Sequence, residues 1–188
     1  MLSADTILLK LAPPVLPVLP SAVAKATGVK FMSFSGYSAQ NPSCNIKKRA
    51  FPQTVALAGG EQAVIFENEL LRKKTDCYNA IKMVLALAAG PHNSSNLSQL
   101  DAEITAYLPL LNICGVQNAL ELKKLCNLPL EAAKIRMLEL TAYRKNMPAL
   151  SSTDNKIIER YLPFIWGNAK QSMALTQADP KRIIQDME

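Results

Sequence analysis

The sequence predicts an all-α fold, in which a compact multi-helix bundle follows a long, proline-rich and mostly extended N-terminal arm. Glycine is scarce, at 7 of 188 residues, which favours helices over a sheet with many tight turns. Apolar residues recur at helical spacing from residue 61 onwards. Half of the twelve prolines and nearly all of the net positive charge lie in the first third of the chain. We therefore expect a basic arm over residues 1–60 and a helical core domain over residues 61–188.

The arm combines prolines with a surplus of positive charge. Ser3 is expected to cap a short helix that ends before Pro13 and Pro14, because proline fixes φ and lacks the amide proton that a helix needs. Residues 1–60 hold six bases and a single acid, Asp5. Such a surplus is typical of a segment that lies against a polyanion or an acidic surface, and it is also compatible with an organelle targeting peptide.

The longest stretch with one consistent helical pattern is 61–90. Thr75 and Asp76 can cap a new helix, so we expect either one long helix or, preferably, two helices that join near Lys74. The apolar end of the stretch is shorter than the about 20 residues that a membrane span needs. The apolar residues of the pattern recur at steps of three, four or seven, at Ala63, Phe66, Leu70, Cys77, Ile81, Val84 and Ala88.

A series of shorter helices is expected after Gly90. Ser98 with Asp101 resembles a capping box that opens the first of them, and Pro129 suits the start of a later one. This later helix spans residues 130–146, and its apolar residues are Ala133, Ile135, Leu138 and Ala142.

Two segments of this region share a Tyr-Leu-Pro unit, residues 101–115 and residues 154–168. The likeness indicates either a duplicated structural unit or coincidence. In both segments the proline is expected to kink or break the helix.

Few residues are of the kinds that perform catalysis or bind metal ions. His92 is the sole histidine, and it is expected to be exposed in a polar loop without a catalytic partner. No glycine-rich phosphate loop or nucleophile motif is present. We therefore expect no enzyme activity, no cofactor, no metal site and a reducing compartment, the cytoplasm or a virion. The cysteines lack the spacing of a zinc site, and two of them are expected in the core: Cys44, Cys77, Cys114 and Cys126, of which Cys77 and Cys114 are the core residues.

Basic residues cluster beside aromatic ones at two places in the first half of the chain. Bases of this kind bind phosphate groups, and exposed aromatic rings stack on unpaired nucleobases. Later basic pairs, such as Arg144 and Lys145, are typical of the last turn of a helix. The candidate nucleic-acid-binding residues are Lys47, Lys48, Arg49, Phe51, Arg72, Lys73, Lys74 and Tyr78.

Together these features predict a self-assembling structural protein that packages nucleic acid, such as a nucleocapsid or helical coat subunit. Its expected partners are nucleic acid, with RNA placed first, and copies of itself, with no membrane. Two alternatives are a helical adaptor or effector that binds another protein without nucleic acid, and an organelle-imported helical protein. The arm would bridge subunits, as filament-forming contacts do, through Pro14, Val15, Leu16, Val18 and Leu19.

Overall fold

The computed structural model describes residues 2–42, 52–57, 60–66, 74–90 and 96–176, with side chains except those of residues 74–75 and 166–176. Within these ranges the chain is mostly helical, as predicted, but it also contains a small three-stranded sheet that the predicted all-α fold lacks. In chain order the elements are α1 (Ala4–Lys10), α2 (Pro20–Thr27), β1 (Lys30–Ser33), α3 (Phe34–Gln40), β2 (Gln53–Ala56), β3 (Gln62–Phe66), α4 (Lys74–Ala89), α5 (Leu97–Thr105), α6 (Leu108–Ile113), α7 (Ala119–Cys126), α8 (Leu130–Asn146) and α9 (Ser152–Thr176).

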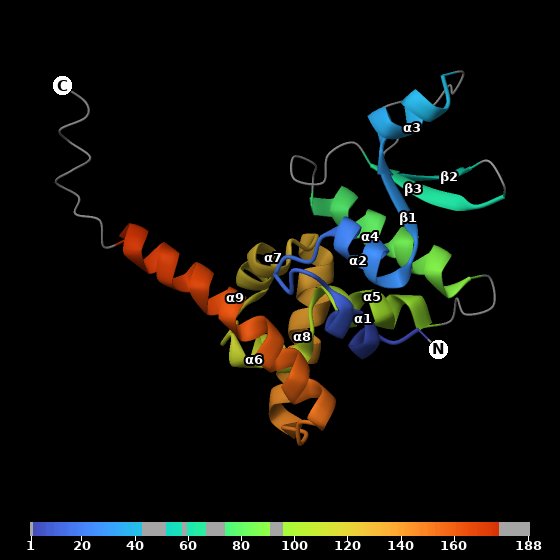
Figure 1. The fold of residues 1–188 in the computed structure, drawn as a ribbon. Coiled ribbons are helices and arrows are strands. Elements are labelled where there is room, and N and C mark those ends of the chain that lie inside the picture. Colours follow the sequence, from blue (N-terminus) through green and yellow to red (C-terminus); the bar gives the residue numbers. More distant parts are fainter. Residues whose placement is uncertain (1, 43–51, 58–59, 67–73, 91–95, 177–188) are drawn as a thin grey trace, which may run out of the picture.

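The sheet lies at one end of the molecule with α3 above it, and α2 and α4 lie on its other side (Figure 1). Its strand order is β1-β3-β2, with β1 parallel and β2 antiparallel to the central strand β3. Residues 63–66 of β3 are all buried. Ala63 and Ile65 pack in a cluster with Tyr37 of α3, whereas Phe66 packs in a cluster with Cys77 of α4.

The central strand corrects the helical prediction for residues 61–90. The apolar residues of β3 are contiguous, and two of them, Val64 and Ile65, are β-branched. A strand that is buried on both faces needs such a run, and over four residues periodicity does not distinguish it from part of a buried helix. Within the described residues α4 begins at Lys74, and the residues before it, where the first of two joined helices was expected, lie outside the described ranges.

The main hydrophobic core lies where α1, α2, α4, α5, α6 and α9 meet. α2 packs along α4, and α1 contacts both α5 and α9. The N-terminal helices therefore belong to the same core as helices that follow residue 61. The proline-rich segment between α1 and α2 is not helical. Large side chains that are completely buried in this core include Ile7, Leu8, Leu11, Leu85, Ile104, Leu110, Ile157 and Tyr161.

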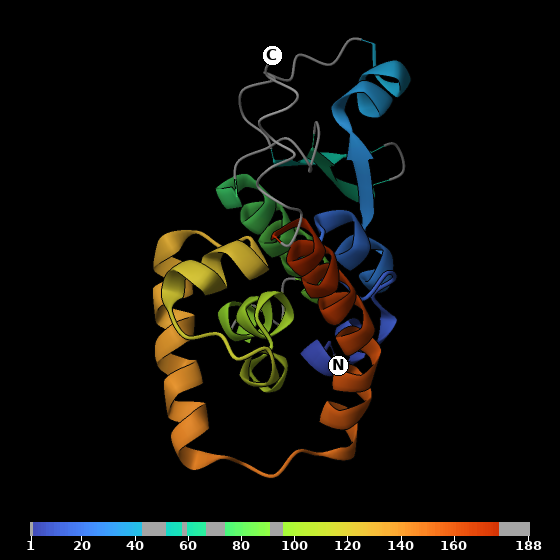
Figure 2. The same cartoon turned by 90° about the vertical axis from the view of Figure 1, so that its left-hand side faces the viewer.

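A second core holds α6, α7 and α8 together. The Asn118 side chain caps α7 by accepting hydrogen bonds from the backbone amides of Leu120 and Glu121, and Asn127, with a φ of 55°, turns the chain into α8. Figure 2 shows α8 and α9 along opposite edges of the molecule, with α5 and α6 between them. The buried residues of this core include Leu111, Leu122, Cys126, Ala133 and Leu140.

The two Tyr-Leu-Pro units fold differently. Pro109 is the second residue of α6, and the chain breaks between α5 and α6 just before it. Pro163 lies inside α9, which continues through it. The proline thus breaks the helix in the first unit, as expected, whereas α9 has no break at Pro163. In the second unit the buried Ile157 and Tyr161 anchor the helix one turn earlier, which offsets the hydrogen bond lost at the proline.

Candidate functional site

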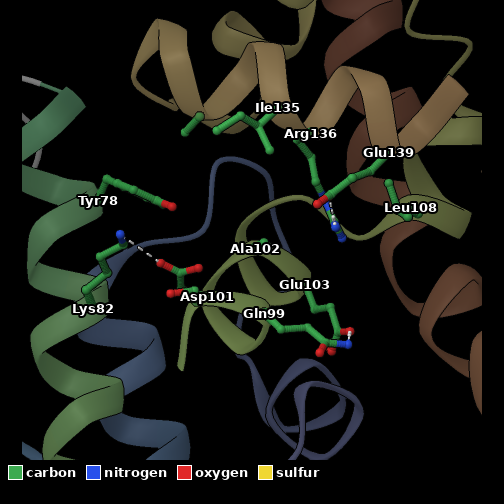
Figure 3. Close-up of a pocket in the computed structure, with 12 residues that line it drawn as sticks. Tyr78, Lys82, Gln99, Asp101, Ala102, Glu103, Leu108, Ile135, Arg136 and Glu139 are labelled. Carbon is green, nitrogen blue, oxygen red and sulfur yellow. Dashed lines mark hydrogen bonds and ion pairs between the residues drawn. The ribbon is translucent and has the colours of Figure 1, made fainter. Parts of the chain in front are cut away.

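A groove between α4, α5 and α8, lined by both charged and apolar side chains, is the clearest candidate for a binding site in the described part of the chain. Its cavity volume is about 720 Å³. Figure 3 shows side chains from the three helices pointing toward one another across it. The residues that line it are Tyr78, Lys82, Ser98, Gln99, Asp101, Ala102, Glu103, Leu108, Ala132, Ile135, Arg136 and Glu139.

On one side of the groove, Lys82 of α4 pairs with Asp101 of α5 (Figure 3). The lysine Nζ lies 3.3 Å from Asp101 Oδ2 and 4.8 Å from the centre of the Tyr78 ring. The contact falls outside hydrogen-bond geometry, since Oδ2 is buried without a hydrogen-bond partner in the described residues. Burial raises the pKa of Asp101, and the charge of Lys82, together with the polar contacts of Lys82 and Tyr78, partly offsets this effect. The pair therefore joins α4 to α5.

On the other side, Arg136 of α8 is almost completely buried. Its Nε donates a hydrogen bond of 2.7 Å to the carbonyl oxygen of Ala106, which follows α5, and its Nη1 donates to the carboxylate of Glu139. The carbonyl groups at a helix C-terminus lack partners within the helix and bear partial negative charge. Arg136 thus satisfies one of these groups and ties α8 to the joint between α5 and α6.

The charges in this groove compensate one another. Lys82 faces Asp101, and Arg136 faces Glu139, while Glu103 accepts a hydrogen bond from Gln99. A phosphate group placed here would have to displace carboxylates from both bases. The groove therefore suits a polypeptide or a neutral polar ligand better than a nucleic-acid backbone.

The described residues offer little for catalysis. No group of three or more histidine, cysteine or acidic side chains is arranged to hold a metal ion within them. Burial raises the pKa of the Cys114 thiol and raises that of Cys126 to about 12, so neither is a reactive thiolate at neutral pH. Cys77 is buried, as predicted, and Cys114 is half-buried. Cys44 and His92 lie outside the described residues.

The predicted nucleic-acid-binding residues fall mostly outside the described side chains. Tyr78 is the exception: it is half-buried on the wall of the groove, with Lys82 over its ring. Burial and the nearby charge of Asp101 raise its pKa. Stacking of Tyr78 on a base stays a prediction. The predicted residues whose side chains are not described are Lys47, Lys48, Arg49, Phe51, Arg72, Lys73 and Lys74.

The residues predicted to contact a second subunit lie between α1 and α2. Pro14 and Val18 are buried, and Val15, Leu16 and Leu19 are half-buried. Val18 belongs to the main core, and Leu16 packs against both cores. These residues thus pack against the helices of their own chain, and their contact with a second subunit stays a prediction.

An apolar face of α8 is the feature that sequence reasoning misjudged. Ala133, Ile135, Leu138 and Ala142 were the apolar residues expected in this helix. Ala133 is buried, but Ala142 is exposed, and Ile135 is 60% and Leu138 is 73% exposed. The helix instead buries Arg136 and Leu140 together with Ala133. A pattern of apolar residues does not identify a buried arginine as an inward-facing residue, although its guanidinium group has hydrogen-bond partners inside the protein.

The chain matches no protein-family model, and comparison with curated proteins and with solved structures gives no match. In the described part of the chain, no helix combines the length and the apolar character that crossing a bilayer requires.

Proposed function

We propose that this protein is a structural subunit that self-assembles and packages nucleic acid through contacts with the phosphate backbone. The observation that supports self-assembly is the exposed stripe of α8, defined here as Glu131, Ile135, Leu138, Ala142 and Lys145. Large hydrophobic side chains that are exposed at helical spacing on one face are typical of a protein contact.

The support for nucleic-acid binding is electrostatic. The chain has a formal net charge of +6, and most of this surplus belongs to residues outside the described side chains, at positions 47–49 and 72–74 among others. Neutralising phosphates releases bound counterions, which gives sequence-independent affinity that falls with salt. The bases at 47–49 are our first choice, because no acid lies near them in sequence.

A helical adaptor that binds another protein is the second candidate. The compensated charges of the groove between α4, α5 and α8 favour it, as do the N-terminal helices that pack on their own body. Nucleic acid distinguishes the two candidates, because an adaptor of this kind would purify without it.

The test is size-exclusion chromatography of the full chain with absorbance read at 260 and 280 nm, followed by binding of a single-stranded RNA over a range of salt concentrations. The triple variant Lys47→Glu, Lys48→Glu and Arg49→Glu should lose co-purifying nucleic acid. The loss of three phosphate contacts should make the slope of log affinity against log salt shallower by about 2, because each contact with a single strand contributes about 0.7.

A matched control changes the net charge equally at exposed lysines elsewhere, with Lys25→Glu, Lys124→Glu and Lys156→Glu. This control should keep most of the binding. Equal losses in both triple variants would refute a site at residues 47–49. A wild-type chain that neither purifies with nucleic acid nor binds added RNA would refute packaging and favour the adaptor.

A further inference from the structure

We propose that two copies of this chain pair through α8 in antiparallel orientation about a twofold axis. This inference deepens the self-assembly part of the proposed function and rests on it. The α8 stripe follows steps of four, three, four and three residues, which is the heptad spacing of a coiled-coil seam. All five of its residues are exposed.

The position of α8 in the fold leaves this face exposed to meet another helix, and Ile135 at its edge also lines the groove between α4, α5 and α8. The opposite face, with Ala133, Arg136 and Leu140, is buried against the body of the molecule. Figure 2 shows α8 along one edge of the molecule, with α5 and α6 on its inner side. Because α8 has 17 residues, its outer face offers a straight surface of about 25 Å.

The charges at the ends of the stripe identify the partner as a second copy and set its direction. Glu131 lies in the first turn of α8, and Lys145 lies in the last. An antiparallel pair places Glu131 of each copy near Lys145 of the other, and it also opposes the two helix dipoles. A parallel pair would instead place like charges together. Lys134 donates to Oε1 of Glu131 within the helix, which leaves Oε2 for the second copy.

The middle of the stripe is apolar and self-complementary. Leu138 is its central residue, so a twofold axis through this position brings Leu138 and Ile135 of the two copies into one small hydrophobic contact. A single helix face of this length buries less than the about 800 Å² per partner of a stable dimer. We therefore expect a dissociation constant in the micromolar range rather than a permanent dimer.

The test is sedimentation velocity on the full chain from about 1 to 200 μM, after nuclease treatment and a high-salt wash that remove nucleic acid. The single variants Glu131→Lys and Lys145→Glu should each weaken pairing at least fivefold. The double variant should restore it to within about twofold of the wild type, because antiparallel pairing re-forms the ion pairs with reversed sign. Leu138→Asp should abolish pairing, and Lys156→Glu, at an exposed site on α9, should leave it unchanged.

Each outcome separates this inference from the proposed function. A wild-type chain that is monomeric throughout the range overturns the pairing, as does a dimer that survives Leu138→Asp or a double variant that shows no rescue. If that monomer still binds RNA in a salt-dependent manner, nucleic-acid binding stands while the α8 interface fails. A dimer that follows the charge-reversal pattern but binds no RNA supports the interface and refutes packaging. Circular dichroism spectra confirm that each variant is folded.

Discussion

Replacing Arg136 by methionine probes the contact between α8 and the joint of α5 and α6. Methionine keeps most of the side-chain volume, so the cavity left behind is small. The substitution removes a charged hydrogen bond of 2.7 Å to the carbonyl oxygen of Ala106, a residue with no exposed surface. A hydrogen bond to a charged group contributes about 1.5–3 kcal/mol, and a buried carbonyl that loses its donor adds to that cost. We therefore expect the free energy of unfolding to fall by about 3 kcal/mol.

Glu139→Gln is the matched control, because Glu139 is the other acceptor of the Arg136 guanidinium. Its side chain is 45% exposed, against 8% for that of Arg136. Ion pairs with an exposed partner contribute about 0–1 kcal/mol, so this variant should lose less than about 1 kcal/mol. The contrast separates the buried hydrogen bond to the carbonyl from the ion pair at the surface.

The assay is urea unfolding followed by circular dichroism at 222 nm, with the free energy extrapolated to water for both variants and the wild type. A loss of about 3 kcal/mol is a large fraction of the 5–15 kcal/mol that stabilises a typical domain. A loss for Arg136→Met that is no larger than the loss for Glu139→Gln would contradict a dominant role for the buried hydrogen bond. Large and equal losses would contradict it too, because the ion pair alone would then account for both.

Two further predictions concern buried tyrosines and a capping carboxylate. Tyr161→Phe should be neutral or stabilising by up to about 1 kcal/mol, because the buried Tyr161 hydroxyl has no hydrogen-bond partner in the described residues. Tyr107→Phe should cost about 1–2 kcal/mol, because the Tyr107 hydroxyl donates to Asp154. Thermal unfolding of both variants checks this contrast, and equal losses of stability would contradict it. Although burial opposes the effect, hydrogen bonds from Tyr107 and Ser151 lower the pKa of Asp154 below 3.8. The folded chain then binds fewer protons there than the unfolded chain, so this stabilisation is present above about pH 4 and is lost as the pH falls through the lower, folded pKa. Asp154→Asn should therefore reduce stability at pH 7 and flatten its fall at acid pH, and an unchanged acid limb in pH-dependent unfolding would contradict the assignment.

Local patterns within one turn predicted where α1 and α8 begin, but they were wrong for α5. This helix starts at Leu97 after Asn96, and the expected capping box of Ser98 and Asp101 does not form. Ser3 caps α1 by accepting from the amide of Thr6, and Pro129 precedes the first residue of α8. Such signals depend on residues three or four apart, so the sequence contains them directly. The strand β3 was not predicted, because it is paired with two short segments that show no alternation of apolar and polar residues of their own. One of them, β1, is about 30 residues away in the chain, and the other, β2, lies just before β3.

Of the residues predicted to form a binding site, Tyr78 alone lines the groove in the described part of the chain. The main contacts of the groove join residues that are far apart in the chain, such as Lys82 with Asp101 and Arg136 with Ala106. No periodicity relates such residues. The same reason explains the misjudged face of α8, where Arg136 points inward and Leu138 outward against the expectation from hydrophobicity alone.

The mostly helical fold, the start of several helices and the basic charge could be predicted from the sequence, because these properties depend on near neighbours and on composition. Other properties required the folded chain: the N-terminal helices share a core with α4, α5 and α9, and Lys82 and Arg136 have compensating partners. The outward direction of the α8 stripe is another. Burial and ion pairing depend on which elements meet in space, and packing between distant segments settles that choice.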